Sequence, residues 1–291
     1  MATSTPERGA RCASIPAAFV LALGAQAALA GDPADPLADR PEGIPTSLLG
    51  TYIRPRELLV YPFFEYTRHN KFEYKPGELG VSGPGSEDEF KGKTVEREYL
   101  LFLAYAFSDS LALEFESALH SSLEFTRAGD DRTGTPDKLR ESGLGDTEIN
   151  LRWRYARETA RRPDITFFMK TVFPLQKSKK LLGSRDWEFE PGVVLTKDYS
   201  FGTLAARGAI SYSSGDRKFD FAEWGIDYLK RLSPNWRLAL SVEGHQVDEI
   251  AVIGELQYAL RRNAVLKLNM GIGLTEKAPS IAPEIGILFR F

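Results

Sequence analysis

An alternation of apolar and polar residues with a period of two runs along most of the chain. In the stretch APEIGILFRF, Ile285, Phe289 and Phe291 share one parity, while Glu284 and Arg290 share the other. Residues of one parity lie on one face of a β-strand, so this stretch predicts a strand with one apolar and one charged face. No helical period persists beyond residue 56. The alternation therefore restricts the chain to an all-β fold.

Twelve segments carry this pattern, with turn residues between them. They cover residues 57–68, 94–107, 111–126, 146–157, 164–174, 187–198, 203–213, 219–230, 235–246, 249–260, 263–275 and 280–291. In residues 111–126, for example, Leu113, Phe115, Leu123 and Phe125 share one side. A tilted strand needs about nine to eleven residues to cross a bilayer, so these segments are long enough to do so.

The connections between the segments alternate in length. The first, third and fifth are long, whereas the second, fourth and sixth are short, such as SDS and YSFG. Short periplasmic turns and longer extracellular loops are typical of outer-membrane barrels. Aromatic residues also gather near the short turns, as in an interfacial girdle: Phe107, Tyr155, Tyr199, Tyr228, Trp236, Tyr258 and Phe289. We predict a transmembrane antiparallel up-and-down β-barrel of about 12 strands over residues 57–291, with short periplasmic turns and longer extracellular loops.

The first 56 residues divide into two parts. Residues 1–30 have the positive start, apolar stretch and Ala28-Leu29-Ala30 cleavage pattern of a signal peptide. Residues 31–56 are rich in Pro, Gly and Asp and indicate a periplasmic lead-in, for which a short helix and a small plug in the lumen are both open. The only cysteine, Cys12, lies in the first part, so the mature chain has no disulfide and no thiolate metal ligand.

If the apolar parity faces lipid, the polar parity lines the lumen. The candidate lumen-lining residues are Glu96, Glu98, Glu114, Glu116, His120, Glu148, Arg152, Arg154, Lys170, Arg207, Glu243, Glu255 and Lys267. Acidic residues outnumber basic ones on this parity, which favours cations in a conducting lumen. The alternative is that the Arg–Glu pairs fill the lumen and fix strand register, because open porins have roughly 16 to 18 strands.

Catalytic and metal-binding patterns are weak. A barrel phospholipase needs a serine–histidine pair that reaches lipid, but His120 and His245 fall on the lumen parity. We therefore expect no enzyme, and a lipid-modifying enzyme is the disfavoured alternative. No residue spacing indicates a metal site, and no cofactor is expected.

The expected partners follow from the barrel. Outer-membrane lipid and lipopolysaccharide surround it, and four cations of the loop QKSKKLLGSR are candidate contacts for lipopolysaccharide phosphates: Lys177, Lys179, Lys180 and Arg185. The final strand resembles the signature that the barrel-assembly machinery recognises. The near-balance of 37 basic and 40 acidic residues gives no basic field for nucleic acid.

The stretch GLGDTEINLRWRY at residues 143–155 is the most distinctive internal feature. It resembles the family named for the MetA pathway of phenol degradation, whose members are outer-membrane barrels of Gram-negative bacteria. The resemblance extends to the layout of most of the mature chain, and it implies uptake of aromatic compounds. We therefore predict a channel or transporter for small solutes, hydrophobic or aromatic compounds among them. A structural envelope barrel with a plugged, charged lumen is the alternative.

Overall fold

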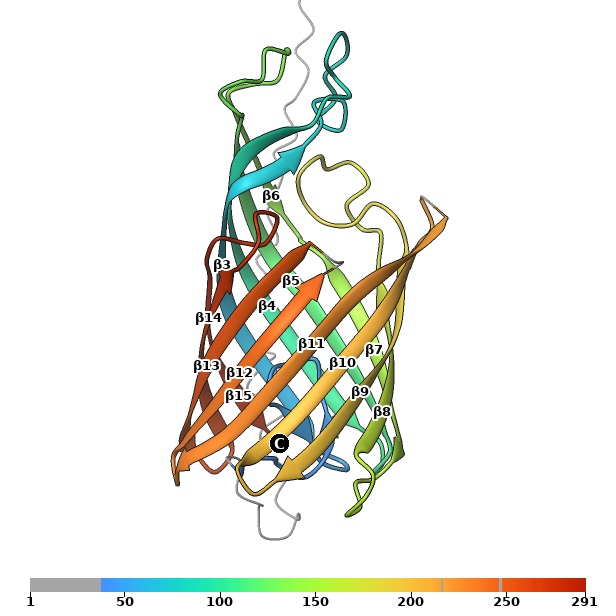
Figure 1. The fold of residues 1–291 in the computed structure, drawn as a ribbon, viewed down its shortest axis with the longest axis vertical. Helices are drawn as coiled ribbons and strands as arrows, with labels where there is room; N and C mark the ends of the chain where they lie inside the picture. Colours follow the sequence, from blue (N-terminus) through green and yellow to red (C-terminus); the bar gives the residue numbers. More distant parts are fainter. Residues whose placement is uncertain (1–37, 216, 246–247) are drawn as a thin grey trace, which may run out of the picture.

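Twelve antiparallel strands close into a single barrel in the computed structural model, which describes residues 38–215, 217–245 and 248–291 (Figure 1). The strands are β3 (Leu58–Tyr74), β4 (Phe90–Ala106), β5 (Leu111–Thr126), β7 (Thr147–Ala156), β8 (Asp164–Val172), β9 (Glu188–Tyr199), β10 (Gly202–Ser213), β11 (Lys218–Ser233), β12 (Trp236–His245), β13 (Glu249–Arg261), β14 (Ala264–Gly273) and β15 (Ala282–Arg290). Each pairs with the next along the chain, and β15 pairs with β3 to close the wall. The predicted fold class is confirmed. The signal peptide of residues 1–30 lies outside the described residues.

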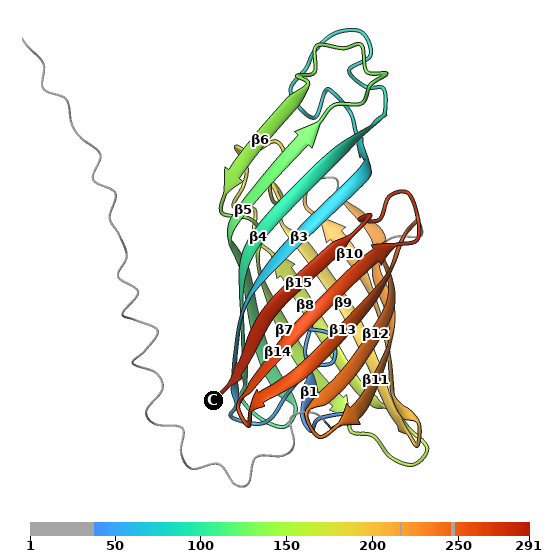
Figure 2. The same ribbon diagram turned by 90° about the vertical axis from the view of Figure 1, so that its left-hand side faces the viewer.

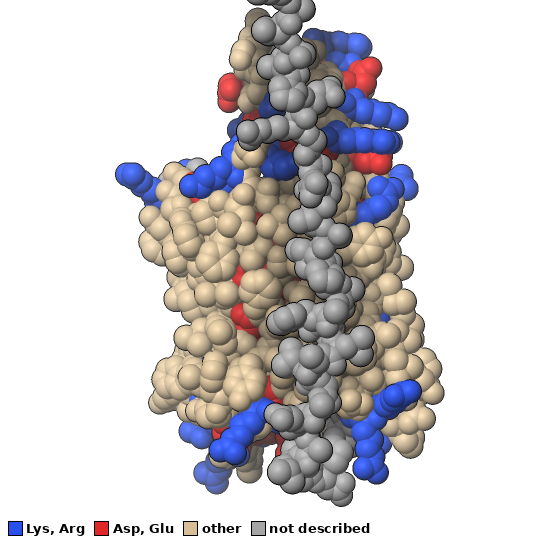
Figure 3. All heavy atoms as spheres, turned by 180° about the vertical axis from the view of Figure 1, so that it is seen from behind, with Lys and Arg blue, Asp and Glu red and all other residues tan. Residues whose placement is uncertain are grey.

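A belt of apolar side chains surrounds the barrel. Outward residues such as Leu151, Leu195, Ile226 and Ile285 are exposed, and Figure 3 shows a broad tan zone between Lys and Arg side chains above and below. Such exposure of contiguous apolar surface is stable only against lipid. At the short-turn end, aromatic rings pack against each other, including Trp236 and Tyr258 with ring centroids 4.7 Å apart. No helix in the described ranges is long and apolar enough to cross a membrane.

One side of the barrel continues above this belt. Strands β3, β4 and β5, joined by β6 (Lys138–Gly143), rise beyond the other strands (Figure 2). A β-bulge in β5 marks the transition, because Tyr99 lies opposite His120 while Leu100 lies opposite Ala118. The extra residue inverts the parity of the strand. The expectation that residues 111–126 keep one apolar side is therefore wrong above the bulge.

Above the bulge, apolar residues face inward and polar residues face outward. Leu123 and Phe125 are buried in a cluster with Tyr74, Leu79 and Leu182, whereas Leu113 below the bulge is exposed. This is the pattern of a water-soluble structure rather than that of a lipid-facing wall. The upper parts of β3–β6 and their loops form an extracellular extension with its own core.

Asp131 fixes the loop between β5 and β6 onto this core. It accepts hydrogen bonds from the Tyr74 hydroxyl at 2.7 Å and from the Thr133 backbone amide at 2.8 Å. Burial raises the pKa of Asp131, but the hydrogen bonds from Thr133, Tyr74 and Thr135 outweigh it and hold the pKa below its ordinary value. The carboxylate is therefore charged at neutral pH, where its hydrogen bonds are strongest.

Replacing Asp131 with Asn should loosen this loop without unfolding the barrel. Hydrogen bonds to a charged group contribute about 1.5–3 kcal/mol, and the amide cannot accept all of those that Asp131 accepts. We expect faster tryptic cleavage after Arg132 at neutral pH, followed on gels of folded protein. The exposed Asp130→Asn is the control and should leave the cleavage rate unchanged. Equal rates for Asp131→Asn and the wild type would contradict this account.

Candidate functional site: the lumen and its N-terminal hairpin

The N-terminal segment of residues 38–57 lies inside the periplasmic half of the barrel. Its two short strands, β1 (Ile44–Pro45) and β2 (Tyr52–Ile53), pair as an antiparallel hairpin, and no helix forms between them. Ile44 and Ile53 are fully buried in an apolar cluster on the inner faces of β3, β4 and β15. Tyr52 packs on the opposite wall against Leu229 and Ala239. The hairpin is therefore held between two sides of the lumen.

Charged side chains of the barrel wall bind the backbone of this hairpin. Lys267 donates to the Leu49 carbonyl at 3.2 Å, Arg290 donates to the Tyr52 carbonyl at 3.1 Å, and Glu114 accepts from the Ser47 amide at 3.1 Å. Arg237 donates to the carbonyl of Gly50. Backbone groups removed from water need such partners. The same contacts satisfy buried charges of the wall.

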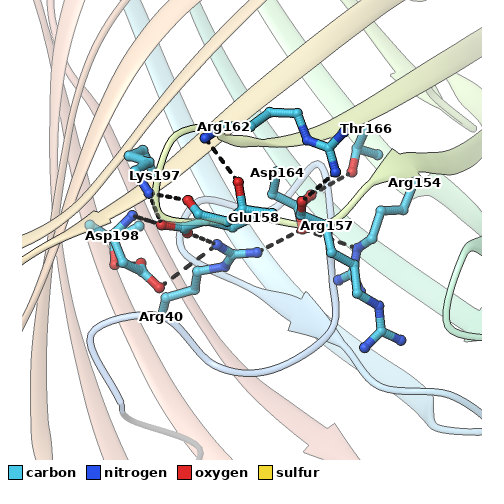
Figure 4. Close-up of polar contacts among 11 residues, drawn as sticks. Arg40, Arg154, Arg157, Glu158, Arg162, Asp164, Thr166, Lys197 and Asp198 are labelled. Carbon is cyan, nitrogen blue, oxygen red and sulfur yellow. Dashed lines mark hydrogen bonds and ion pairs between the residues drawn. The ribbon is translucent and has the colours of Figure 1, made fainter.

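Arg40 attaches the segment at the periplasmic end of the barrel. Figure 4 shows its guanidinium between carboxylates from two different turns of the wall. It lies 2.7 Å from Glu158, 2.8 Å from Asp164 and 3.7 Å from Asp198. A planar guanidinium that pairs with more than one carboxylate gives a well-oriented attachment.

A cavity of about 540 Å³, lined by both charged and apolar residues, lies above the hairpin. It extends from Leu49 and Thr51 of the hairpin to Glu249 and Pro279 near the extracellular ends of β13 and β15. A second space of about 290 Å³ adjoins it. Glu65, Glu116 and Glu148 line both spaces. We call the region around these shared glutamates, together with the second space, the vestibule. The vestibule also includes Glu96, Glu98 and Asp146.

The acidic residues of the vestibule contrast with the ion pairs below and beside it. None of Glu96, Glu98 and Glu116 has a basic partner within ion-pair distance among the described residues. Acidic side chains also outnumber basic ones in the lining of the adjoining cavity, and carboxylates without a partner in such a space produce a negative potential there. The vestibule would therefore attract cations from the extracellular side.

The other predicted lumen residues form pairs on the wall. Arg152 lies 2.7 Å from Glu114, and Lys267 lies 3.3 Å from Glu255. Arg154 pairs with Asp164 at the periplasmic end rather than with a glutamate of β5. Lys170 pairs with Glu190 at 2.5 Å, and Arg207 pairs with Asp227 at 2.9 Å and with Glu243. Arg152, Lys170, Arg207, Glu243, Glu255 and Lys267 line the cavity, whereas Arg154 and Asp164 lie outside its lining.

The prediction that His120 lines the lumen is wrong. It lies opposite Tyr99 on the outer face, where the centroids of the two rings are 6.5 Å apart. The cause is the bulge in β5, which turns both Leu119 and His120 outward. His120 therefore faces the lipid side of the wall, contrary to the prediction from strand parity. In the described part of the chain, however, His120 has no serine partner, and His245 lies 4.0 Å from Glu249.

The GLGD stretch has a structural role where the wall changes from β6 to β7. Gly143 has a φ of 149°, which favours glycine, and a side chain at Gly145 would collide with Ser121 and Ala118. Asp146 accepts a hydrogen bond from the Ser184 amide at 2.6 Å. The stretch therefore joins the extracellular extension to the barrel and fixes the loop of residues 173–187 beside the vestibule.

The cations of that loop mostly bind carbonyl groups of the protein. Lys179 donates to Ser142, and Lys180 to Leu79, each at 2.7 Å. Arg185 donates to the Lys180 carbonyl at 3.1 Å. Lys177 is exposed. Three of the four predicted lipopolysaccharide contacts thus hold the loop in place.

The apolar wall that receives the hairpin was not predicted from the sequence. Leu59, Tyr61, Phe63 and Phe102 face the lumen and are buried. The signal was present in the runs LLVYPFF and YLLFLAYAF, which are apolar on both parities. A strand that is apolar on both faces is buried on both faces. In a barrel, such a strand requires something apolar inside.

No family model matches the chain, and no curated protein matches it. Among solved structures, it is similar to the COG4313 outer membrane channel from Pseudomonas putida F1, with a TM-score of 0.57 and 14% identity over 89% of this chain and 99% of that chain. Matches to the KdgM porin in complex with disordered oligogalacturonate (TM-score 0.47, 10% identity, 79% and 99% covered) and to outer membrane phospholipase A from Escherichia coli (TM-score 0.38, 10% identity, 83% and 94% covered) are weaker. By its fold and by its lipid-facing belt, the chain is an outer-membrane β-barrel.

Proposed function

We infer that the protein is a channel of the Gram-negative outer membrane for small solutes, with an extracellular vestibule that favours cations and a hairpin that restricts passage toward the periplasm. The observation that carries this proposal is the continuous space between the extracellular rim and the hairpin, in whose lining acidic side chains outnumber basic ones. A barrel whose only task were mechanical would gain stability by pairing those carboxylates, because unpaired like charges repel.

The solute class in this proposal is small hydrophobic or aromatic compounds. The cavity lining combines Phe63, Phe168, Val194 and Ile253 with the charged groups. The guanidinium of Arg152 lies 5.3 Å from the centroid of the Phe168 ring. A pocket with apolar surface and a few polar groups can bind an aromatic solute and orient it. Membership of the family named for the MetA pathway of phenol degradation belongs to the same proposal, supported by the GLGD stretch.

Neutralising the vestibule tests the proposal. We expect the refolded mature protein to conduct in a planar bilayer with a reversal potential that shows cation preference. The triple variant Glu96→Gln/Glu98→Gln/Glu116→Gln should fold, since it breaks no ion pair, and should lose most of that preference. Neutral aromatic alcohols should block the wild-type current.

Exposed loop acids provide the matched control. Glu78→Gln/Glu89→Gln/Asp130→Asn removes the same number of charges outside the vestibule and should keep the cation preference. An anion-selective wild type, or a vestibule variant with unchanged selectivity, would overturn the proposed pathway.

A structural envelope barrel is the second candidate, and the hairpin favours it. Residues 38–57 and the ion pairs around them fill the periplasmic half of the lumen. This candidate expects a folded protein that is silent in the bilayer and whose loss weakens the envelope. Conductance of the folded protein in the planar bilayer therefore distinguishes the channel from the structural barrel.

A further inference from the structure

Basic side chains lie in three successive rows across the strands on the outer face of the extracellular extension, just above the lipid belt. Antiparallel register places residues of adjacent strands side by side on this face. One row contains Arg97, the next contains Arg68 and Arg140, and the third contains Lys93 and Lys138. We call these five residues the basic face. Because they project from strands rather than from loops, their positions are fixed by the wall.

The basic face begins directly where the lipid belt ends. The row beneath Arg97 contains Phe64 and Tyr99, which face outward, and Tyr99 is 58% exposed. Successive rows on one face of a strand are about 7 Å apart. The cations therefore lie at the level of the lipid headgroups and just above it.

The charge of this face is predominantly positive. Glu124 is its one carboxylate among these three rows in the described structure, at 3.5 Å from Arg97 and 3.2 Å from Arg140. The side chains of Arg97 and Arg140 remain 42% and 70% exposed. Lys93 and Lys138 are exposed as well. The five cations of the basic face thus exceed its one carboxylate by four charges.

We propose that the basic face binds the phosphate groups of lipid A in the outer leaflet. Arginine pairs with phosphate oxygens through two parallel N–H donors, and lysine adds a point charge. The height of the face above the belt matches a phosphorylated headgroup that is anchored by acyl chains against Phe64, Tyr99 and Leu119. The face differs from the loop of residues 173–187, whose cations mostly bind carbonyl groups of the protein.

Binding of deep-rough lipopolysaccharide to the folded full-length mature protein in detergent tests this assignment. The variant Lys93→Gln/Arg97→Gln/Arg140→Gln should bind about 10-fold to 100-fold more weakly than the wild type, measured by native mass spectrometry. Arg161→Gln/Arg261→Gln/Arg262→Gln removes three exposed cations from the periplasmic end and should bind as the wild type does. Gel mobility before and after heating verifies that each variant is folded.

Two further comparisons identify the chemistry. Dephosphorylated lipid A should bind the wild type as weakly as native lipid A binds the basic-face variant. Arg97→Lys/Arg140→Lys should bind with intermediate affinity, because lysine retains the charge and loses the paired donors. The assignment is overturned if the basic-face variant binds lipopolysaccharide normally, or if phosphatidylglycerol competes as well as lipid A does.

Discussion

A refolded protein that begins at Arg54, and so lacks the hairpin, should conduct with a single-channel conductance several-fold above that of the full mature protein. The hairpin occupies the periplasmic half of the lumen, and its removal opens that half to water, exposing charged groups of the wall and the apolar residues of β3 and β4 that it covers. The barrel should still close, because the ladder between β15 and β3 uses no residue before Leu58 and the pair of Arg290 with Glu57 is retained. Wall charges that lose hairpin partners would then be hydrated by the water that enters.

A point variant separates tethering of the hairpin from its bulk. Arg40→Gln removes the ion pairs with Glu158 and Asp164 but leaves the apolar contacts of Ile44 and Ile53. We expect brief openings to the conductance of the truncated protein, with the conductance of the full mature protein at all other times. Arg161→Gln is the control, since Arg161 is exposed at the same end and is not among the residues that hold Arg40.

Either of two results would contradict this role of the hairpin. The first is a truncated protein whose gel mobility shows that it is folded but whose conductance is no higher than that of the full mature protein. The second is that Arg40→Gln and Arg161→Gln give the same single-channel records. In both cases the restriction would lie in the side chains of the wall rather than in the hairpin.

The strands could be predicted from the sequence because a lipid-facing barrel wall imposes its period on every crossing. Leu151, Trp153 and Tyr155 alternate with Arg152 and Arg154 because lipid lies on one side and a polar lumen on the other. Nothing else in the chain competes with that pattern below the bulge. The positions of most lumen residues follow from parity alone.

Parity fails where one residue is inserted. The bulge at Leu119 and His120 cannot be recognised from composition, since both residues fit a regular strand. Its effect is large, because a shift by one residue exchanges the two faces of all that follows. The outward position of His120 and the inward position of Phe125 both result from it. To predict these two positions, one must know which residues of β4 and β5 lie opposite each other.

The hairpin was harder to predict because its stability comes from distant partners. Residues 38–57 have little regular structure of their own, and the cluster that buries Ile44 and Ile53 combines β3 with strands far along the chain, such as β4 and β15. The ion pairs were also only partly predictable. Parity places Arg154 in the lumen, but its partner, Asp164, is fixed by the turn between β7 and β8.

Lys267→Leu should destabilise the folded barrel by about 3–5 kcal/mol, because it leaves the carboxylate of Glu255 buried without its cation. Both side chains are 1% exposed, and Lys267 also lies 5.2 Å from the ring centroid of Tyr61. The measurement is the urea midpoint of unfolding in lipid vesicles, followed by tryptophan fluorescence. Lys277→Leu removes an exposed lysine that pairs with Asp248 in the extracellular region and should change the midpoint little.

The double variant Lys267→Leu/Glu255→Leu distinguishes the ion pair from the hairpin contacts. Replacing both members of a buried pair with apolar residues is often neutral or stabilising, so most of the lost stability should return. The hairpin contacts should not return, since Lys267 also donates to the Leu49 carbonyl and to the Thr51 hydroxyl, each at 3.2 Å. We therefore expect a stable barrel with brief openings like those of Arg40→Gln. A double variant that is as unstable as Lys267→Leu would show that the hairpin contacts, rather than the unpaired carboxylate, account for the loss. A stable double variant that conducts as the wild type does would show that Lys267 has no part in holding the hairpin in place.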